Sequence, residues 1–296
     1  MEYVKLNNGV EMPILGFGVY QIPANETKRC VLDAIKVGFR AIDTAQSYFN
    51  ESEVGDAIIE SKIPRDELFI TTKVWIDNYG YENCKNSVLE SLKKLKTGYI
   101  DLVLLHQPFS DYYGAYRALE DLYKEGKIRA IGVSNFYPDR LTDICLFERN
   151  IVPAINQVEV NPLNAQFQAQ KNMEKYGVKM EAWAPFGEGR NNLFNNELLI
   201  NIGKKYNKSS AQIMLRWLIQ RGIIIACKST HIERMKENFD VFDFKLSDSD
   251  MNEINKLDTG NSLFFNHQNP EMVEWFDNIV KSRRNNKDCR NDKKNW

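Results

Sequence analysis

The sequence has 296 residues, of which 43% are hydrophobic and 27% are charged, and its formal net charge is -1. This composition is typical of a folded globular domain and excludes a fibrous or intrinsically disordered chain. The near-zero net charge gives no indication of a nucleic-acid or membrane partner.

The cysteines and the first residues indicate a reducing compartment. The five cysteines lie far apart in the sequence, and no CxxC motif occurs. Their odd number and long spacings predict free thiols rather than disulfides or a zinc site. The N-terminal segment MEYVKLNNGVEMP lacks the apolar core of a signal peptide, and no stretch approaches the ~20 apolar residues of a membrane span. We therefore expect a cytoplasmic protein.

The chain begins with a predicted β-hairpin and then alternates between strand and helix patterns. Asn7, Asn8 and Gly9 give a turn signal between two short alternating runs. Helical patterns such as 26–38 and 83–98 each end at a glycine, as is common at a helix C-terminus. Eight apolar runs predict strands at 14–18, 40–44, 68–74, 101–106, 129–134, 155–160, 179–184 and 223–229.

The alternation of strands and helices predicts the fold. Single helices between successive strands imply right-handed crossovers and a parallel sheet. Eight such units with nearly continuous apolar strands predict an α/β fold that closes into a (β/α)8 TIM barrel. The main alternative is a doubly wound open sheet, which usually carries GxGxxG after its first strand. The segment GFGVYQ (16–21) does not match that motif.

Three segments lie outside the eightfold repeat. Residues 186–199 predict a loop and an extra helix, and residues 257–276 predict a C-terminal loop rich in aromatic residues. Residues 281–296 contain seven basic and two acidic residues and predict a flexible tail. An anion-attracting arm is the alternative for this tail. We expect one domain over residues 1–280.

Polar and titratable residues follow the predicted strands, where barrel enzymes place their catalytic groups. Each of these residues also has a purely structural interpretation: a histidine can belong to the core, an aspartate can cap a helix and a lysine can be solvated. Independent accidents of this kind should scatter over both ends of the barrel, so their gathering at one end favours a functional site. The residues are Asp43 with Tyr48, Lys73, His106, Ser134 with Asn135, Gln157, and Lys228 with Ser229.

Four of these residues suit carbonyl reduction. The pKa of a free tyrosine is ~10, which is high for acid–base chemistry near neutrality. We expect the Lys73 ammonium to lower the pKa of Tyr48, and Asp43 to hold that ammonium in place. His106 can orient a substrate oxygen. Together, these four residues can protonate the alkoxide that develops when a carbonyl is reduced.

The chain resembles the aldo-keto reductases from about residue 6 to residue 276, and its form is similar to the bacterial branch near 2,5-diketogluconate reductases. Each motif alone is weak evidence for this resemblance, but the occurrence of all of them in this order is specific to the family. They are GFGVYQ (16–21), GFRAIDTAQSYFNESEVG (38–55), FITTKVW (69–75), DLVLLHQP (101–108), GKIRAIGVSNF (126–136), INQVEVNP (155–162), EAWAPFGEG (181–189) and KSTHIERMKENFDVFDF (228–244).

The resemblance implies NADPH as cofactor and a role for each matching residue. It implies a catalytic tetrad of Asp43, Tyr48, Lys73 and His106, with Tyr48 as general acid. Ser134, Asn135 and Gln157 match residues that hold the nicotinamide carboxamide, and Trp183 matches the aromatic residue that stacks on its ring. The remaining cofactor contacts that it implies are Gly18, Val19, Tyr20, Asp43, Ala184, Pro185, Phe186, Lys228, Ser229, Thr230, Arg234, Glu237 and Asn238.

Among these, Lys228 and Arg234 suit the adenosine 2′-phosphate, because cations form strong charge-assisted hydrogen bonds with a phosphate dianion. A solvated pair of surface cations is the alternative. Cys227 next to Lys228 is either a modestly activated thiol or a buried inert one.

We expect a substrate pocket with aromatic walls, which suits small carbonyl compounds. Its expected contacts are Tyr20, Tyr48, Phe49, Trp75, His106 and Phe109, with Trp183 beside them and the 261–276 segment as a lid. The expected partner is this small substrate. We expect no nucleic-acid, membrane or metal partner and no second subunit. Two other functions stay open: a catalytically silent protein of this fold that binds or senses NADPH, and a barrel hydrolase with paired carboxylates, for which Glu159 and Glu181 are the candidates beside Asp43.

Overall fold

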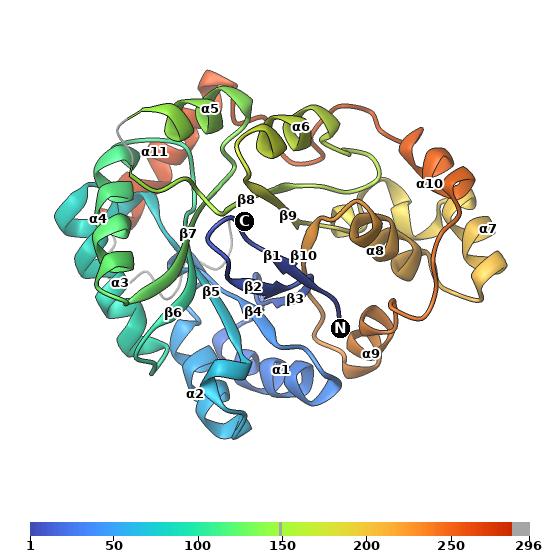
Figure 1. The fold of residues 1–296 in the computed structure, drawn as a ribbon, viewed down its shortest axis with the longest axis horizontal. Helices are drawn as coiled ribbons and strands as arrows, with labels where there is room; N and C mark the ends of the chain where they lie inside the picture. The colour runs from blue at the N-terminus through green and yellow to red at the C-terminus, as the bar shows by residue number, and fades with distance from the viewer. Residues whose placement is uncertain (148–149, 286–296) are drawn as a thin grey trace.

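The computed structural model describes residues 1–147 and 150–285. Its centre is a closed barrel of parallel strands in the order β10–β3–β4–β5–β6–β7–β8–β9 (Figure 1). The predicted (β/α)8 barrel is therefore confirmed, with every predicted run within two residues of a strand at either end. The barrel strands are β3 (Leu15–Gly18), β4 (Ala41–Asp43), β5 (Phe69–Val74), β6 (Ile100–Leu105), β7 (Ile128–Ser134), β8 (Ile155–Glu159), β9 (Lys179–Trp183) and β10 (Ile224–Cys227).

Helices surround the barrel (Figure 1). Strand residues that face outward, such as Val103 and Ile131, pack with helix residues such as Leu119 in the main hydrophobic core. The helices are α1 (Ala24–Val37), α2 (Glu51–Ser61), α3 (Tyr81–Lys94), α4 (Tyr112–Lys124), α5 (Pro138–Leu146), α6 (Phe167–Lys175), α7 (Glu197–Tyr206), α8 (Ser210–Gln220), α9 (Ile232–Phe239), α10 (Asp248–Asn255) and α11 (Pro270–Asn285). Short 3-10 helices are η1 (Gln46–Tyr48), η2 (Arg65–Glu67), η3 (Ile76–Asn78) and η4 (Gly187–Asn195).

The predicted hairpin covers the N-terminal end of the barrel. Strands β1 (Tyr3–Lys5) and β2 (Glu11–Pro13) pair antiparallel, and Gly9 has a φ of 88° in their turn, a conformation that glycine adopts without strain. Leu6 and Met12 of the hairpin segment are buried in one cluster with inward-facing barrel residues such as Phe69. The hairpin thus closes this end, and the opposite end carries the polar residues.

Alternation along the strands divides the barrel interior into an apolar and a polar layer. Ala41 of β4 belongs to the inner cluster with the hairpin, Ile42 belongs to the outer core, and Asp43 therefore faces inward again. By the same alternation, Phe69 and Lys73 of β5 both face inward. Strands β4 and β5 thus both end with an inward polar group at one end of the barrel.

One predicted helix end is wrong. Helix α1 is followed by Gly38 with a φ of 127°, as the sequence predicted. Helix α3, however, ends at Lys94, and Lys96 with a φ of 53° takes the left-handed position that was expected for Gly98. The reversal therefore comes two residues before the glycine.

The C-terminal segment differs from its predicted loop. Residues 261–269 form a loop, but helix α11 begins at Pro270, where Asn269 Oδ1 accepts a hydrogen bond at 3.1 Å from the Glu271 amide. Proline is favoured at the first position of a helix, because its missing N–H has no helical partner there. Helix α11 continues through residues 281–285 of the predicted tail. Residues 286–296, with Cys289, lie outside the described residues.

Within residues 1–147 and 150–285, no helix combines the length and apolar character that a transmembrane span needs.

Candidate active site

The expected tetrad gathers at the C-terminal ends of three neighbouring strands. Asp43 is the last residue of β4, Lys73 is the second-last residue of β5, and His106 directly follows β6. Tyr48 ends the short helix η1, which returns the chain over the mouth after β4. Because all strands of the barrel are parallel, these ends meet at one face of the molecule.

Lys73 is the centre of this group and is fully buried. Its Nζ donates to Asp43 Oδ1 at 2.6 Å, to the Thr44 carbonyl at 3.1 Å and to the Tyr48 hydroxyl at 3.3 Å. The three acceptors satisfy the three N–H donors of an ammonium. Lys73 is therefore a fixed cation that contacts the Tyr48 oxygen.

The electrostatics of Tyr48 are dominated by burial. Burial raises the pKa of Tyr48 to about 12. Lys73 acts to lower this pKa, as expected, but the hydroxyl lies among buried groups where desolvation has the larger effect. Burial alone would lower the pKa of Lys73, but Asp43 and Tyr48 raise it above its ordinary value. At neutral pH Tyr48 therefore holds its proton and Lys73 keeps its charge.

His106 completes the group as a neutral imidazole. Burial, with Lys73 nearby, keeps the pKa of His106 well below its usual value. Its ring lies 5.7 Å from the Tyr48 ring and 5.2 Å from the Trp75 ring, both edge-on, and Nδ1 lies 3.4 Å from Ser47 Oγ. A neutral imidazole carries one N–H donor, so His106 can orient a carbonyl oxygen without adding charge.

The expected nicotinamide contacts lie on β7, β8 and β9, beside the tetrad. Ser134, Asn135 and Gln157 are buried, and Gln157 Nε2 donates to Asp43 Oδ2 at 3.0 Å. Trp183 Nε1 donates to Asn135 Oδ1 at 2.9 Å, which fixes the indole at the end of β9. The structure therefore brings these four residues and Asp43 into one connected patch.

The first-strand loop depends on Asn50, which is not among the predicted site residues. Asn50 is buried, and its Nδ2 donates to the Val19 carbonyl at 3.1 Å and to the Ile22 carbonyl at 3.3 Å. It thereby holds the segment that follows Gly18, and Tyr20 in this segment lies with its ring 5.0 Å from the Tyr48 ring. Asn50 precedes helix α2 in the sequence and resembles an ordinary helix cap, so no local signal indicated this long-range contact.

The residues expected at the 2′-phosphate and adenine lie beyond β10, away from the tetrad. Lys228 and Arg234 are exposed, whereas Ser229 and Asn238 are buried. Glu237 is half-buried and accepts a hydrogen bond from Ser209. The two cations therefore face solvent on the β10–α9 segment.

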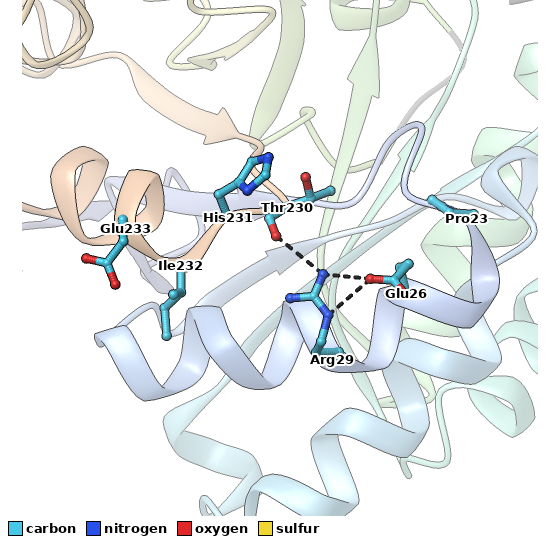
Figure 2. Close-up of a pocket in the computed structure, with 7 residues that line it drawn as sticks. All are labelled: Pro23, Glu26, Arg29, Thr230, His231, Ile232 and Glu233. Carbon is cyan, nitrogen blue, oxygen red and sulfur yellow. Dashed lines mark hydrogen bonds and ion pairs between the residues drawn. The ribbon is translucent and has the colours of Figure 1, made fainter.

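A cavity of about 650 Å³ lies between α1 and this β10–α9 segment (Figure 2). Arg29 of α1 forms an ion pair with Glu26 at 2.7 Å and donates to the Thr230 carbonyl at 3.3 Å, so it connects α1 to the expected phosphate loop. The cavity is lined by Pro23, Glu26, Arg29, Thr230, His231, Ile232 and Glu233.

The remaining expected cofactor residues follow β9. Ala184 has a φ of 49°, Pro185 is buried, and Phe186 packs on the main core before helix η4 begins at Gly187. The chain therefore turns sharply after the Trp183 indole.

Aromatic side chains surround the barrel mouth. Phe49 is 51% exposed and Trp75 only 4%. Phe109 lies 5.4 Å from Phe276 of α11, ring to ring. From the C-terminal loop, Phe264 packs edge-on against Trp183 at 5.1 Å. The expected pocket walls and the loop thus meet above the tetrad.

Comparisons with known proteins identify the family of this chain. The profile of the Aldo/keto reductase family matches residues 14–259. Glyoxal reductase of Bacillus subtilis (strain 168) is 47% identical over 256 residues, which cover 86% of this chain and 92% of that protein. The chain belongs to the aldo-keto reductase family.

Solved structures of the family superpose closely. An aldo-keto reductase enzyme from a Medee basin deep-sea metagenome library is 42% identical and has a TM-score of 0.87, over 90% of this chain and 98% of that one. A Bombyx mori aldo-keto reductase in complex with NADP is 34% identical and has a TM-score of 0.85, over 89% and 95% of the two chains. The expected family is thus confirmed, the bacterial relative agrees with the expected branch, and the protein is an oxidoreductase.

This aldo-keto reductase carries one mouth residue that lies within the predicted tail. Arg283 of α11 lies with its guanidinium 4.9 Å from the Trp75 ring and 5.2 Å from the Phe49 ring. Its position depends on the long helix α11, which the sequence analysis did not predict. A cation–aromatic contact of this kind has no local sequence signature.

The cysteines of this aldo-keto reductase are free thiols in the part of the chain that the structure describes. Burial raises the pKa of Cys227 to about 12, and its Sγ lies 3.5 Å from the Gly16 carbonyl. Cys227 is therefore the inert, buried thiol of the two alternatives. Residues 1–147 and 150–285 contain no cluster of side chains suited to a metal ion.

Proposed function

We propose that this chain reduces aldehydes and ketones to alcohols with NADPH, with Tyr48 as the proton donor. The observation that carries the proposal is the position of Lys73 Nζ, at 2.6 Å from Asp43 Oδ1 and 3.3 Å from the Tyr48 hydroxyl at the barrel mouth. A buried cation that contacts a phenol stabilises the phenolate left after proton donation.

The residues present suit NADPH. Buried hydroxyl and amide groups of Ser134, Asn135 and Gln157 offer hydrogen bonds to a carboxamide, next to the indole of Trp183. At the other end, exposed Lys228 and Arg234 suit a phosphate. When bound, NADPH supplies the hydride for the carbonyl carbon.

Each side chain of the tetrad has a different role in proton transfer. Tyr48 holds a proton at neutral pH and gives it to the carbonyl oxygen as that oxygen gains negative charge. Lys73, kept charged by Asp43, stabilises the phenolate. Neutral His106 donates a hydrogen bond that orients the oxygen. Each of these interactions strengthens as charge develops, so it favours the transition state over the bound substrate.

The expected substrates are small carbonyl compounds. Tyr20, Phe49, Trp75 and Phe109 give the mouth aromatic walls with few polar groups. The similarity to a protein named glyoxal reductase supports dicarbonyl compounds as the first substrates to test.

The two other functions are less favoured. A silent NADPH-binding protein needs no proton donor, whereas here Asp43, Lys73 and Tyr48 are in contact. A hydrolase needs two carboxylates that face the same bond. Both oxygens of Asp43 are occupied, one by Lys73 and the other by Gln157, so this carboxylate does not face a substrate.

Absorbance of the nicotinamide band tests the proposal. The purified protein is mixed with NADPH, or with NADH, and with glyoxal, methylglyoxal, glyceraldehyde, a nitrobenzaldehyde, 2,5-diketogluconate or a ketosteroid. We expect NADPH consumption with at least one aldehyde and a slower reaction with NADH. Tight NADPH binding without consumption across the panel supports the silent protein, and absence of NADPH binding contradicts the proposal.

A further inference from the structure

The barrel interior contains a second carboxyl group that the proposed chemistry does not use. Glu181 is the middle residue of β9 and is 1% exposed. Its neighbours Met180 and Ala182 belong to the outer core, so the Glu181 side chain faces into the barrel. On the two adjacent strands its backbone partners are Gln157 and Ile224.

Glu181 is connected to the tetrad through Gln157. Gln157 is the register partner of Glu181 on β8 and interacts electrostatically with its carboxyl group, and Gln157 Nε2 donates to Asp43 Oδ2 at 3.0 Å. Asp43 in turn accepts from Lys73, which donates to the Tyr48 hydroxyl. A chain of polar contacts thus leads from Glu181 on β9 across the barrel to the proton donor.

The charges around Glu181 favour its neutral form. The charged groups that face it are Asp43 from β4 and Lys73 from β5, while β8 and β10 present the uncharged Gln157 and Ile224. The single cation already contacts Asp43. Glu181 Oε2 has no hydrogen-bond partner among the described residues. Burial, and then repulsion from Asp43, raise the pKa of Glu181 to about 8.

We propose that Glu181 is a positioning residue for the proton donor Tyr48. Tyr48 donates its proton efficiently while Glu181 is protonated and loses this ability when Glu181 ionises. This inference rests on the proposed reduction. When the proton of Glu181 leaves to water, a second anion faces Lys73. The ammonium is then shared between two carboxylates, and the phenolate left by proton donation is less stabilised. Tyr48 itself keeps its proton throughout this pH range, so its own ionisation does not account for the loss.

The first test compares wild type with Glu181→Gln, which keeps the shape of the side chain and cannot ionise. Single-turnover oxidation of bound NADPH by methylglyoxal is followed from pH 6 to pH 9.5. If only the protonated form reacts, the wild-type rate falls roughly tenfold from pH 7 to pH 9. We expect Glu181→Gln to react within about twofold of wild type at pH 7 and to lack this fall.

A matched control and a second variant make the result specific. Glu51 is 2% exposed but lies on α2, outside the barrel, where it accepts from Thr72 at 2.7 Å. Glu51→Gln should keep the wild-type pH profile. If Glu181→Gln does not fold, Glu181→Met is the second variant, because it also cannot ionise. A fall in rate above pH 7 that persists in the Glu181 variant, or that is absent from wild type, overturns the proposal.

Thermal melting gives a readout that does not depend on turnover. The pKa of a glutamate in the unfolded chain is ~4.3. Because the folded pKa is higher, the contribution of Glu181 to stability is full below ~4.3 and is lost as the pH rises towards 8. The melting temperature of Glu181→Gln relative to wild type should therefore increase from pH 5 to pH 8 and then stay constant.

The two readouts separate the failure of this inference from the failure of the proposed function. A melting difference that is the same at every pH shows that Glu181 does not hold a proton and overturns the inference, whatever the activity. A pH-dependent melting difference in a protein that oxidises no NADPH at any pH overturns the proposed reduction, and with it the positioning role.

Discussion

At the scale of single residues, the site depends on the full burial of Lys73. A buried ammonium is costly unless its donors are all used, and here Asp43, the Thr44 carbonyl and Tyr48 use them. Burial alone would neutralise the lysine, and the adjacent carboxylate prevents this. The same burial keeps Tyr48 protonated, so its hydroxyl is available as a donor at neutral pH.

Removal of the Tyr48 hydroxyl tests this role. Tyr48→Phe keeps the ring but removes the proton, so we expect kcat to fall by about 100-fold or more while NADPH binding is kept. The measurements are steady-state turnover and quenching of tryptophan fluorescence by NADPH. Tyr123→Phe on α4, remote from the mouth, is the control. Full turnover in Tyr48→Phe contradicts the assigned role.

The exposed cation Lys228 tests the cofactor preference. A lost charge-assisted hydrogen bond to phosphate costs about 1.5–3 kcal/mol, so Lys228→Ala should weaken NADPH binding by about ten- to a hundredfold and leave NADH binding unchanged. Lys236→Ala is the control, because Lys236 lies on helix α9, which follows the Lys228 loop, and pairs with Glu233 at 3.0 Å. Equal losses for NADPH and NADH would show that Lys228 does not bind the 2′-phosphate.

At the scale of elements, close helix packing fixes the shell around the barrel. Helices α2 and α3 pack against each other at Gly55, where a Cβ atom would lie 2.3 Å from the Lys94 carbonyl oxygen and 2.8 Å from the Leu95 carbonyl carbon. Helix α2 follows directly after η1, which carries Tyr48. A glycine in the middle of a helix therefore has a packing role here, despite its low helix propensity.

Gly55→Ala tests this packing. Because both neighbours are backbone atoms, they cannot move aside, and we expect the free energy of unfolding to fall by about 1–3 kcal/mol. Gly98→Ala is the matched control, since its Cβ would meet nothing within 4 Å and the chain needs no positive φ there. Urea unfolding should show Gly98→Ala at or slightly above wild-type stability. Equal stabilities of the two variants contradict the packing argument.

At the scale of the whole molecule, stability should depend on pH through its buried titratable groups. His267 is 5% exposed, and its Nε2 lies 2.8 Å from Gln107 Oε1. Burial lowers the pKa of His267 to about 3. Its contribution to stability is therefore present above the unfolded pKa of ~6.5 and is lost as the pH falls towards 3.

His267→Gln tests this linkage. From pH 7 to pH 5, one such histidine should lower the free energy of unfolding by about 2 kcal/mol, because the unfolded chain binds a proton that the native chain does not bind. We expect His267→Gln to lose about 2 kcal/mol less than wild type over this range in urea unfolding. His231→Gln, exposed before α9, should behave as wild type. Parallel losses in wild type and His267→Gln would contradict the assigned protonation state.

The monomeric state and the cytoplasmic location stay predictions. Sedimentation equilibrium tests the first, with 34.4 kDa expected for one chain.

The sequence by itself determined the barrel and the candidate residues of the site. Apolar runs that alternate with helices are compatible with few folds other than a parallel barrel. Asp43, Lys73 and His106 each lie at the C-terminal end of a predicted run. These are local patterns, and the parallel topology converts them into a spatial cluster. The hairpin was also predicted from local signals. An extra helix was expected within residues 186–199, but α7 begins only at Glu197 and extends to Tyr206.

Only the tertiary structure decided which way residues face and what charge they carry. The inward direction of Glu181 follows from the packing of its neighbours Met180 and Ala182 in the outer core. The pKa of Tyr48 depends on how far its hydroxyl is desolvated, and the contacts of Asn50 and Arg283 join segments far apart in the chain. Burial and long-range contact are properties of the packed chain, so no local pattern could report them.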